Sequence, residues 1–69
     1  MPSSVIRRFR YDETQRRLRV TFTSGDVYDY AGVPPEVEAD FRAAFSKGRF
    51  FASHIRDRYR FERIGFAAP

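Results

Sequence analysis

The sequence predicts an α+β fold: a three-stranded antiparallel meander, one or two helices packed over one face, and a final C-terminal strand. Polar and apolar residues alternate over residues 5–11, 17–23 and 27–30, as they do in strands that are buried on one side. Apolar residues then recur at helical spacing over residues 36–45, and alternation returns over residues 59–64. With 69 residues, we expect one domain over residues 1–69 with an ordered core at about residues 5–64.

The first two strands define the faces of the predicted sheet. Residues 5–11 divide their side chains between two faces, with Val5, Arg7, Phe9 and Tyr11 on one and Ile6, Arg8 and Arg10 on the other. After a turn at residues 12–15, the strand at residues 17–23 also alternates. Leu18, Val20 and Phe22 lie on one face, and on the other lie Arg17, Arg19, Thr21 and Thr23. The apolar set is the one that strands bury, so we expect it to face the core.

The turn at residues 24–26 leaves two registers open for the third strand, residues 27–30. A three-residue tip pairs Phe22 with Tyr28 and sends Tyr28 and Tyr30 into the core. A two-residue tip shifts the pairing by one residue and exposes both tyrosines beside the arginines, as a platform on which bases could stack. We favour the core, because a chain this short needs its aromatic rings to build one.

A helix is predicted over residues 36–45, after the prolines at 34 and 35 end the sheet. Its apolar stripe consists of Val37, Phe41, Ala44 and Phe45, and its acidic first turn suits the positive end of the helix dipole. The segment after this helix has two interpretations. Either Gly48 ends the helix in a left-handed cap, or Ser46 begins a second short helix that carries inward Phe50, Phe51, His54 and Ile55.

The last strand is expected at residues 59–64, followed by a tail that frays. Its alternation opposes Tyr59, Phe61 and Arg63 to Arg58, Arg60, Glu62 and Ile64. The expected core consists of Leu18, Val20, Phe22, Val37, Phe41, Phe45, Phe51, Ile55 and Phe61.

The composition excludes several classes of function. The chain has no Cys, which removes disulfides, thiolate metal sites and cysteine nucleophiles and fits a reducing compartment. His54 is the sole imidazole and has no recognisable partner for metal binding or for acid–base catalysis. No segment is apolar enough for a membrane span or a signal peptide. We therefore expect a cytoplasmic protein that is not an enzyme and uses no cofactor, metal or membrane.

Positive charge is the feature that points to a partner. Lys and Arg number 13 against 9 Asp and Glu, which gives a net charge of +4. Arg17 and Arg19 share a sheet face on which neighbouring strands could place Arg8, Arg10, Arg58 and Arg60. A second basic group surrounds the second helix, with Lys47, Arg49, Arg56 and Arg58. These guanidinium groups suit phosphates, although arginines also serve simply to solvate the back of a sheet.

An ordered set of residues along the chain resembles a known family. It consists of Phe22, Gly25, Tyr28, Tyr30, Val33, Pro34, Ser46, Gly48 and Ile55. The set is similar to that of the KTSC domain, whose central Tyr-x-Tyr is matched by Tyr28-Asp29-Tyr30. This domain occurs at the C-terminus of some lysyl-tRNA synthetases and as a stand-alone bacterial protein. RNA binding has been suggested for the family, so the resemblance implies this fold and an RNA partner without an established activity.

We therefore expect a non-catalytic RNA-binding module that holds phosphates with arginines and stacks bases on aromatic rings. The candidate site residues are Arg8, Arg10, Arg17, Arg19, Tyr28, Tyr30, Lys47, Arg49, Arg56, Arg58 and Arg60. If about four arginines contact a single strand, the logarithm of the affinity falls with that of the salt concentration at a slope of about −3. The alternative is a protein-interaction module that binds its partner through an exposed sheet edge or through the aromatic surface near Phe50 and Phe66.

Overall fold

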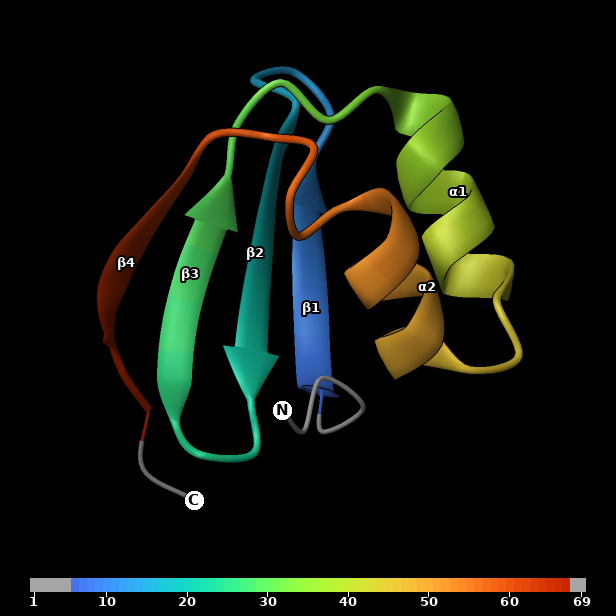
Figure 1. The fold of residues 1–69 in the computed structure, drawn as a ribbon. Coiled ribbons are helices and arrows are strands. Elements are labelled where there is room, and N and C mark those ends of the chain that lie inside the picture. Colours follow the sequence, from blue (N-terminus) through green and yellow to red (C-terminus); the bar gives the residue numbers. More distant parts are fainter. Residues whose placement is uncertain (1–5, 68–69) are drawn as a thin grey trace.

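The protein folds into a four-stranded antiparallel sheet with two helices (Figure 1). A computed structural model describes residues 6–67. In chain order the elements are β1 (Ile6–Asp12), β2 (Arg17–Phe22), β3 (Asp26–Tyr30), α1 (Pro35–Ala43), α2 (Lys47–His54) and β4 (Phe61–Phe66). The sheet order is β1-β2-β3-β4, so the final strand extends the predicted meander at its β3 edge. The α+β class is confirmed, and the predicted three-stranded meander and final strand together make one four-stranded sheet.

Each of the two short helices has its own start signal in the sequence. Pro34 is extended and Pro35 opens α1, where a missing backbone donor has no cost. The Ser46 hydroxyl accepts a hydrogen bond from the Arg49 backbone N–H at 3.3 Å and so caps α2. Of the two interpretations of this segment, the second helix beginning at Ser46 is confirmed.

The core lies between one face of the sheet and the two helices, which sit toward its β1 side (Figure 1). Phe41 of α1 and Phe51 of α2 are buried, and Phe41 stacks on Phe9 of β1 with ring centroids 4.2 Å apart. Phe51 meets the Tyr30 ring of β3 edge-on at 5.3 Å. The fully or almost fully buried apolar residues are Leu18, Val20, Tyr30, Val33, Phe41, Phe51 and Ile55.

The hairpin between β2 and β3 adopts neither of the two predicted pairings, yet it places the tyrosines on the favoured side. Val20 pairs with Tyr28, so the partner of Tyr28 lies two residues earlier in β2 than the predicted three-residue turn requires. The Gly25 N–H donates to the Phe22 carbonyl at 2.9 Å and closes the tip, with Gly25 at a φ of 102°. The shift by an even number of residues keeps Tyr28 and Tyr30 on the core face.

Two predicted core residues are exposed. Phe45 is 106% exposed, because α1 ends at Ala43 and the extended backbone at Ala44 takes the next residue off the helix face. Phe61 is 54% exposed, because the edge strand β4 lies beyond the cover of the helices. Its ring still packs on Tyr28 and Tyr30 with centroids 5.8 Å away in each case.

Two further expectations about side-chain direction are wrong. A register shift in β1 between Ile6 and Arg8 brings Ile6 against the core, whereas strict alternation placed it on the arginine face. His54 is exposed instead of turned inward, and its ring stacks on that of Phe50 with centroids 4.4 Å apart. The predicted start of β1 at Val5 lies outside the described residues.

Candidate nucleic-acid interface

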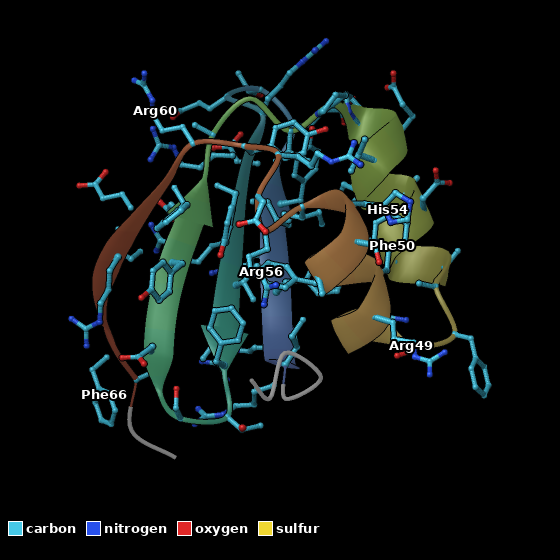
Figure 2. The ribbon with its side chains drawn as sticks, in the orientation of Figure 1. Arg49, Phe50, His54, Arg56, Arg60 and Phe66 are labelled. Atoms are coloured by element: carbon cyan, nitrogen blue, oxygen red, sulfur yellow. The ribbon has the colours of Figure 1, made fainter. Side chains whose placement is uncertain are left out.

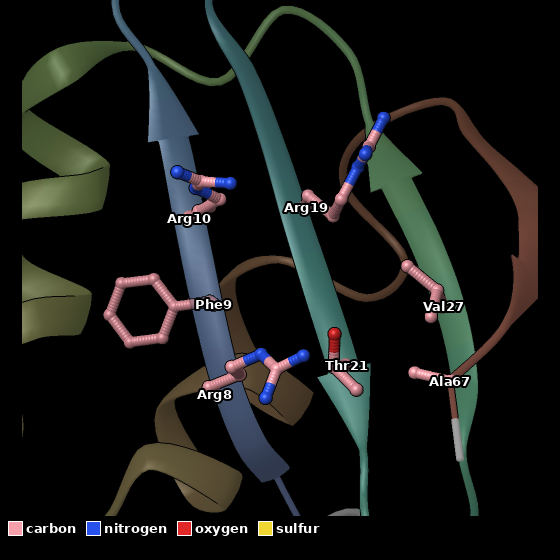
Figure 3. A pocket seen from close by; sticks show the side chains of 7 residues that line it. All are labelled: Arg8, Phe9, Arg10, Arg19, Thr21, Val27 and Ala67. Atoms are coloured by element: carbon pink, nitrogen blue, oxygen red, sulfur yellow. The ribbon is translucent and has the colours of Figure 1, made fainter.

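The face of the sheet turned away from the helices carries an open hollow of about 470 Å³ (Figure 3). Its lining consists of Arg8, Phe9, Arg10, Arg19, Thr21, Val27 and Ala67. Adjacent strands bring these side chains together, since Arg8 pairs with Thr21 and Arg10 with Arg19 across the β1–β2 ladder. Like charges directly opposite one another destabilise a sheet, so the Arg10–Arg19 pairing is a cost that hydrophobic burial on the other face offsets.

A buried carboxylate in β3 holds two of these arginines. Asp29 is 3% exposed and accepts hydrogen bonds from Arg19 Nε at 2.8 Å and Nη2 at 3.1 Å. Arg17 Nη1 reaches the same carboxylate at 3.3 Å. The hydrogen bonds from Arg19 hold the pKa of Asp29 below its ordinary value, against the opposing effect of burial. The same contact raises the pKa of Arg19, so both groups stay charged.

Arg8 and Arg10 differ from this held pair. Both are exposed, and within residues 6–67 neither forms a hydrogen bond or an ion pair. Their guanidinium groups point out of the same face as that of Arg19 (Figure 3). In the described part of the chain, two cations with unused donors therefore lie at the hollow and are available to an anionic ligand.

A hydroxyl group lies at the floor of the hollow. Thr21 is only 5% exposed, and among the described residues its side chain has no hydrogen-bond partner. Figure 3 shows its hydroxyl on the same side of the sheet as the surrounding guanidinium groups. A hydroxyl in this position can donate to an oxyanion, so the hollow offers both charge and a directed neutral donor.

Acidic and basic residues are mixed on the other half of this face. Glu62 of β4 pairs with Asp29 of β3, and both line a second hollow together with Arg17, Ala31, Arg60 and Phe61. Asp12 pairs with Arg17 at the end of the β1–β2 ladder. Arginines without an acidic residue in the same lining are therefore concentrated in a strip along β1 and β2, whereas Asp29 and Glu62 balance Arg17 and Arg60 in the second hollow.

The remaining predicted site residues do not join this strip. Lys47 Nζ donates to the carbonyl of Ala44 at 2.6 Å, and Arg56 pairs with Asp57 at 3.7 Å. Arg49 lies on α2 and Arg56 just after it, apart from Arg60 (Figure 2). Arg58 lies in the segment between α2 and β4, where its N–H donates to the Ile55 carbonyl at 3.1 Å. Sequence proximity alone does not bring this basic group together with the sheet arginines.

Tyr28 and Tyr30 face the core, so they do not lie beside Arg19 as a stacking platform. Burial raises the pKa of Tyr30 to about 12.

Sequence reasoning missed Asp29 and Thr21 as site residues. The signal for Asp29 was present, because a residue between two core-facing tyrosines must point to the arginine face.

Residues 6–67 carry neither a metal-ion cluster nor a membrane-spanning helix. No three His, Asp or Glu side chains in this part of the chain are grouped so that they could hold a metal ion. No helix in the same range has the length and apolar character needed to cross a membrane.

The KTSC domain profile matches residues 2–59, which is most of the chain. The chain belongs to the KTSC domain family. A KTSC domain protein from Yersinia pestis has a similar crystal structure, with a TM-score of 0.86, 37% identity and coverage of 94% of this chain and 92% of that one. A protein of Stutzerimonas stutzeri is 42% identical over 65 residues, which are 93% of this chain and 92% of its own length.

KTSC domains are also found within much longer proteins. A lysine–tRNA ligase of Nostoc punctiforme is 41% identical over 61 residues, or 88% of this chain. A ligase of Trichormus variabilis is 36% identical over 61 residues. The chain spans only 11% of the length of these ligases, so the similarity concerns one domain of each.

Proposed function

We propose that this KTSC domain is a non-catalytic RNA-binding module whose site is the open face of β1 and β2. The observation that carries the proposal is the hollow lined by Arg8, Arg10 and Arg19, where two of the three guanidinium groups have no partner among residues 6–67. Guanidinium groups recognise phosphate oxygens through paired N–H donors. A strip of them on an open face suits a nucleic acid backbone.

The relatives supply a second line of support. Lysine–tRNA ligases, by their name, act on a tRNA, and some of them contain this domain. A domain retained beside such an activity has an RNA within reach. The proposal accordingly places the protein in the cytoplasm, the compartment expected from its lack of Cys.

The test is salt-dependent RNA binding by fluorescence anisotropy, with the unmodified chain and an Arg8→Ser/Arg10→Ser variant. We expect the variant to bind more weakly and its log–log salt slope to be shallower by about 2, because each phosphate contact contributes about 1. The control is Arg49→Ser/Arg58→Ser, which removes the same charge from exposed positions outside the strip. No salt-dependent binding of any RNA up to high micromolar protein would refute the proposal.

A protein-interaction module is the second candidate function. The outer edge strand β4 exposes Phe61 by 54%, Ile64 by 39% and Phe66 by 63%. An edge strand with exposed apolar side chains can pair with a strand of another protein. Size-exclusion chromatography and pull-down distinguish this function: a stable dimer or a specific protein partner that survives Arg8→Ser/Arg10→Ser favours it over RNA binding.

A further inference from the structure

We propose that the RNA taken by this site is double-stranded, and that two consecutive phosphates of one strand lie on two neighbouring rungs of the β1–β2 ladder. The inference rests on the proposed function and names the class of RNA that the site accepts. It predicts recognition of the backbone alone, with no base stacked on the protein.

The first step is the spacing of the two rungs. One rung pairs Arg8 with Thr21 and the next on the same face pairs Arg10 with Arg19. Residues two apart in a strand are separated by about 6.8 Å, which is comparable to the separation of successive phosphates along a nucleic acid strand. A backbone that runs parallel to β1 therefore places one phosphate on each rung.

The donors on the two rungs suit these phosphates. On the first rung, neither the Arg8 guanidinium group nor the Thr21 hydroxyl has a partner within residues 6–67, and both line the hollow. On the second rung, Arg10 is unpartnered within the same range while Asp29 fixes the position of Arg19. Each rung thus combines one exposed guanidinium group with one side chain that is buried or hydrogen-bonded in place.

Carboxylates limit the length and width of the surface on which phosphates can lie. On the third rung Asp12 pairs with Arg17, and Arg17 is engaged by Asp29. Asp29 and Glu62 lie next to the two rungs, on the β3–β4 side. A phosphate placed beyond the second rung would approach a carboxylate, so the contact ends after two phosphates.

The aromatic rings exclude the usual way of binding a single strand. Phe9 lines the hollow, but its ring turns away and stacks on Phe41 (Figure 3). Tyr28 and Tyr30 lie on the opposite face, and the exposed Phe61 ring packs against them there. Proteins that bind single strands stack bases on such rings, whereas duplex RNA is recognised through phosphates and 2′-hydroxyls. The duplex therefore fits this face better than the single strand.

The experiment compares a blunt RNA duplex with each of its component strands at equal nucleotide concentration, by fluorescence anisotropy over a range of salt. We expect the duplex to bind at least about tenfold more tightly, with a log–log salt slope of about −2 for two phosphate contacts. Arg8→Ser and Arg10→Ser should each reduce that slope by about 1. Thr21→Val should weaken duplex binding while Thr21→Ser retains it, because only serine keeps the hydroxyl.

Each failure has a distinct meaning. If a single strand binds as tightly as the duplex, or if Phe61→Ala weakens binding, the duplex inference is overturned while the proposed RNA-binding function stands. If no RNA binds with salt dependence, the proposed function fails and the inference fails with it. Far-ultraviolet circular dichroism of every variant ensures that loss of binding is not loss of the fold.

Discussion

Asp29 and Arg19 form a two-point ion pair on the open face of the sheet, with Arg19 Nε to Asp29 Oδ1 at 2.8 Å and Nη2 to Oδ2 at 3.1 Å. Because Asp29 is 3% exposed, its charge is stabilised by these donors and by Arg17 more than by water. The pair orients Arg19 and reduces the net charge of its surroundings. Arg8 and Arg10, which lack such a carboxylate within residues 6–67, are left to attract an anion.

Replacement of the Asp29 carboxylate should lower the stability of the protein and at the same time strengthen RNA binding. In Asp29→Asn, Arg17 and Arg19 lose their charged partner, so the free energy of unfolding should fall by about 1–3 kcal/mol. The two freed guanidinium groups should tighten RNA binding and steepen the log–log salt slope by about 1. Urea unfolding and fluorescence anisotropy on the same preparation measure the two effects.

Glu62→Gln is the matched control, since Glu62 is exposed on the same face and forms no ion pair within residues 6–67. It raises the net charge by the same amount but should leave the stability within about 0.5 kcal/mol. An Asp29→Asn variant as stable as the unmodified chain would contradict the structural role assigned to the ion pair.

The elements of the fold were predictable because their signals are local. The alternation in β1 and β2 and the Ser46 cap of α2 each depend on a few neighbouring residues. Phe45 was not predictable in this way, since its exposure depends on the helix ending at Ala43, earlier than the apolar spacing suggests. Phe61 was predicted in the core because alternation shows which face of the sheet a side chain is on. It does not show how far across that face the helices extend.

The candidate site was predictable only in part. Alternation correctly placed Arg8, Arg10 and Arg19 on one face, because strand pairing preserves the face of every residue. The division into held and free arginines depends on Asp29, which lies 10 residues from Arg19 in the chain. This ion pair cannot be predicted from a local sequence pattern, because it depends on the register in which β2 pairs with β3.

Phe51 and Phe45 provide a test of the observed core with the same residue type. Phe51 is 1% exposed and meets the rings of Phe22 at 5.5 Å and Tyr30 at 5.3 Å, whereas Phe45 is 106% exposed. Phe51→Ala should lower the free energy of unfolding by about 3–5 kcal/mol, because it leaves a cavity between α2 and the sheet. Phe45→Ala should change it by less than about 0.5 kcal/mol. Urea unfolding that gives similar values for both would place the core elsewhere.

Gly25 is required by two independent features of the β2–β3 hairpin. Its φ is +102°, and a Cβ atom there would clash with the Phe66 ring and lie 2.9 Å from the Ala67 carbonyl oxygen. Gly25→Ala should therefore lower the melting temperature more than Gly32→Ala, where φ is +74° but nothing lies within 4 Å of the added atom. The Gly32 variant reports backbone strain alone, about 1–2 kcal/mol.

A second substitution separates the two contributions at Gly25. Phe66→Ala in the Gly25→Ala background removes the ring that the new methyl group would meet, so it should recover part of the lost melting temperature. The clash with the Ala67 carbonyl and the backbone strain should remain. If Gly25→Ala melts at the same temperature as Gly32→Ala, the close packing of β4 on the hairpin tip is wrong.

The buried Tyr30 hydroxyl predicts a loss of stability at alkaline pH. Burial raises the pKa of Tyr30 to about 12, whereas an unfolded chain ionises its tyrosines at about 10. Between these values the unfolded state loses the proton first, so the free energy of unfolding falls as the pH rises, by about 2 kcal/mol at pH 12. Below about pH 10 both states are protonated, and this contribution to the stability is complete.

Urea unfolding at pH 7 and pH 11 of the unmodified chain and of Tyr30→Phe measures this effect. Phenylalanine preserves the ring that packs on Phe51 but cannot ionise, so the variant should lose about 1.4 kcal/mol less between the two pH values. Part of the decline should persist in the variant, because burial also raises the pKa of Tyr11. If both proteins lose the same stability between pH 7 and pH 11, the Tyr30 hydroxyl is reached by water, and the core does not close over β3 as the structure describes.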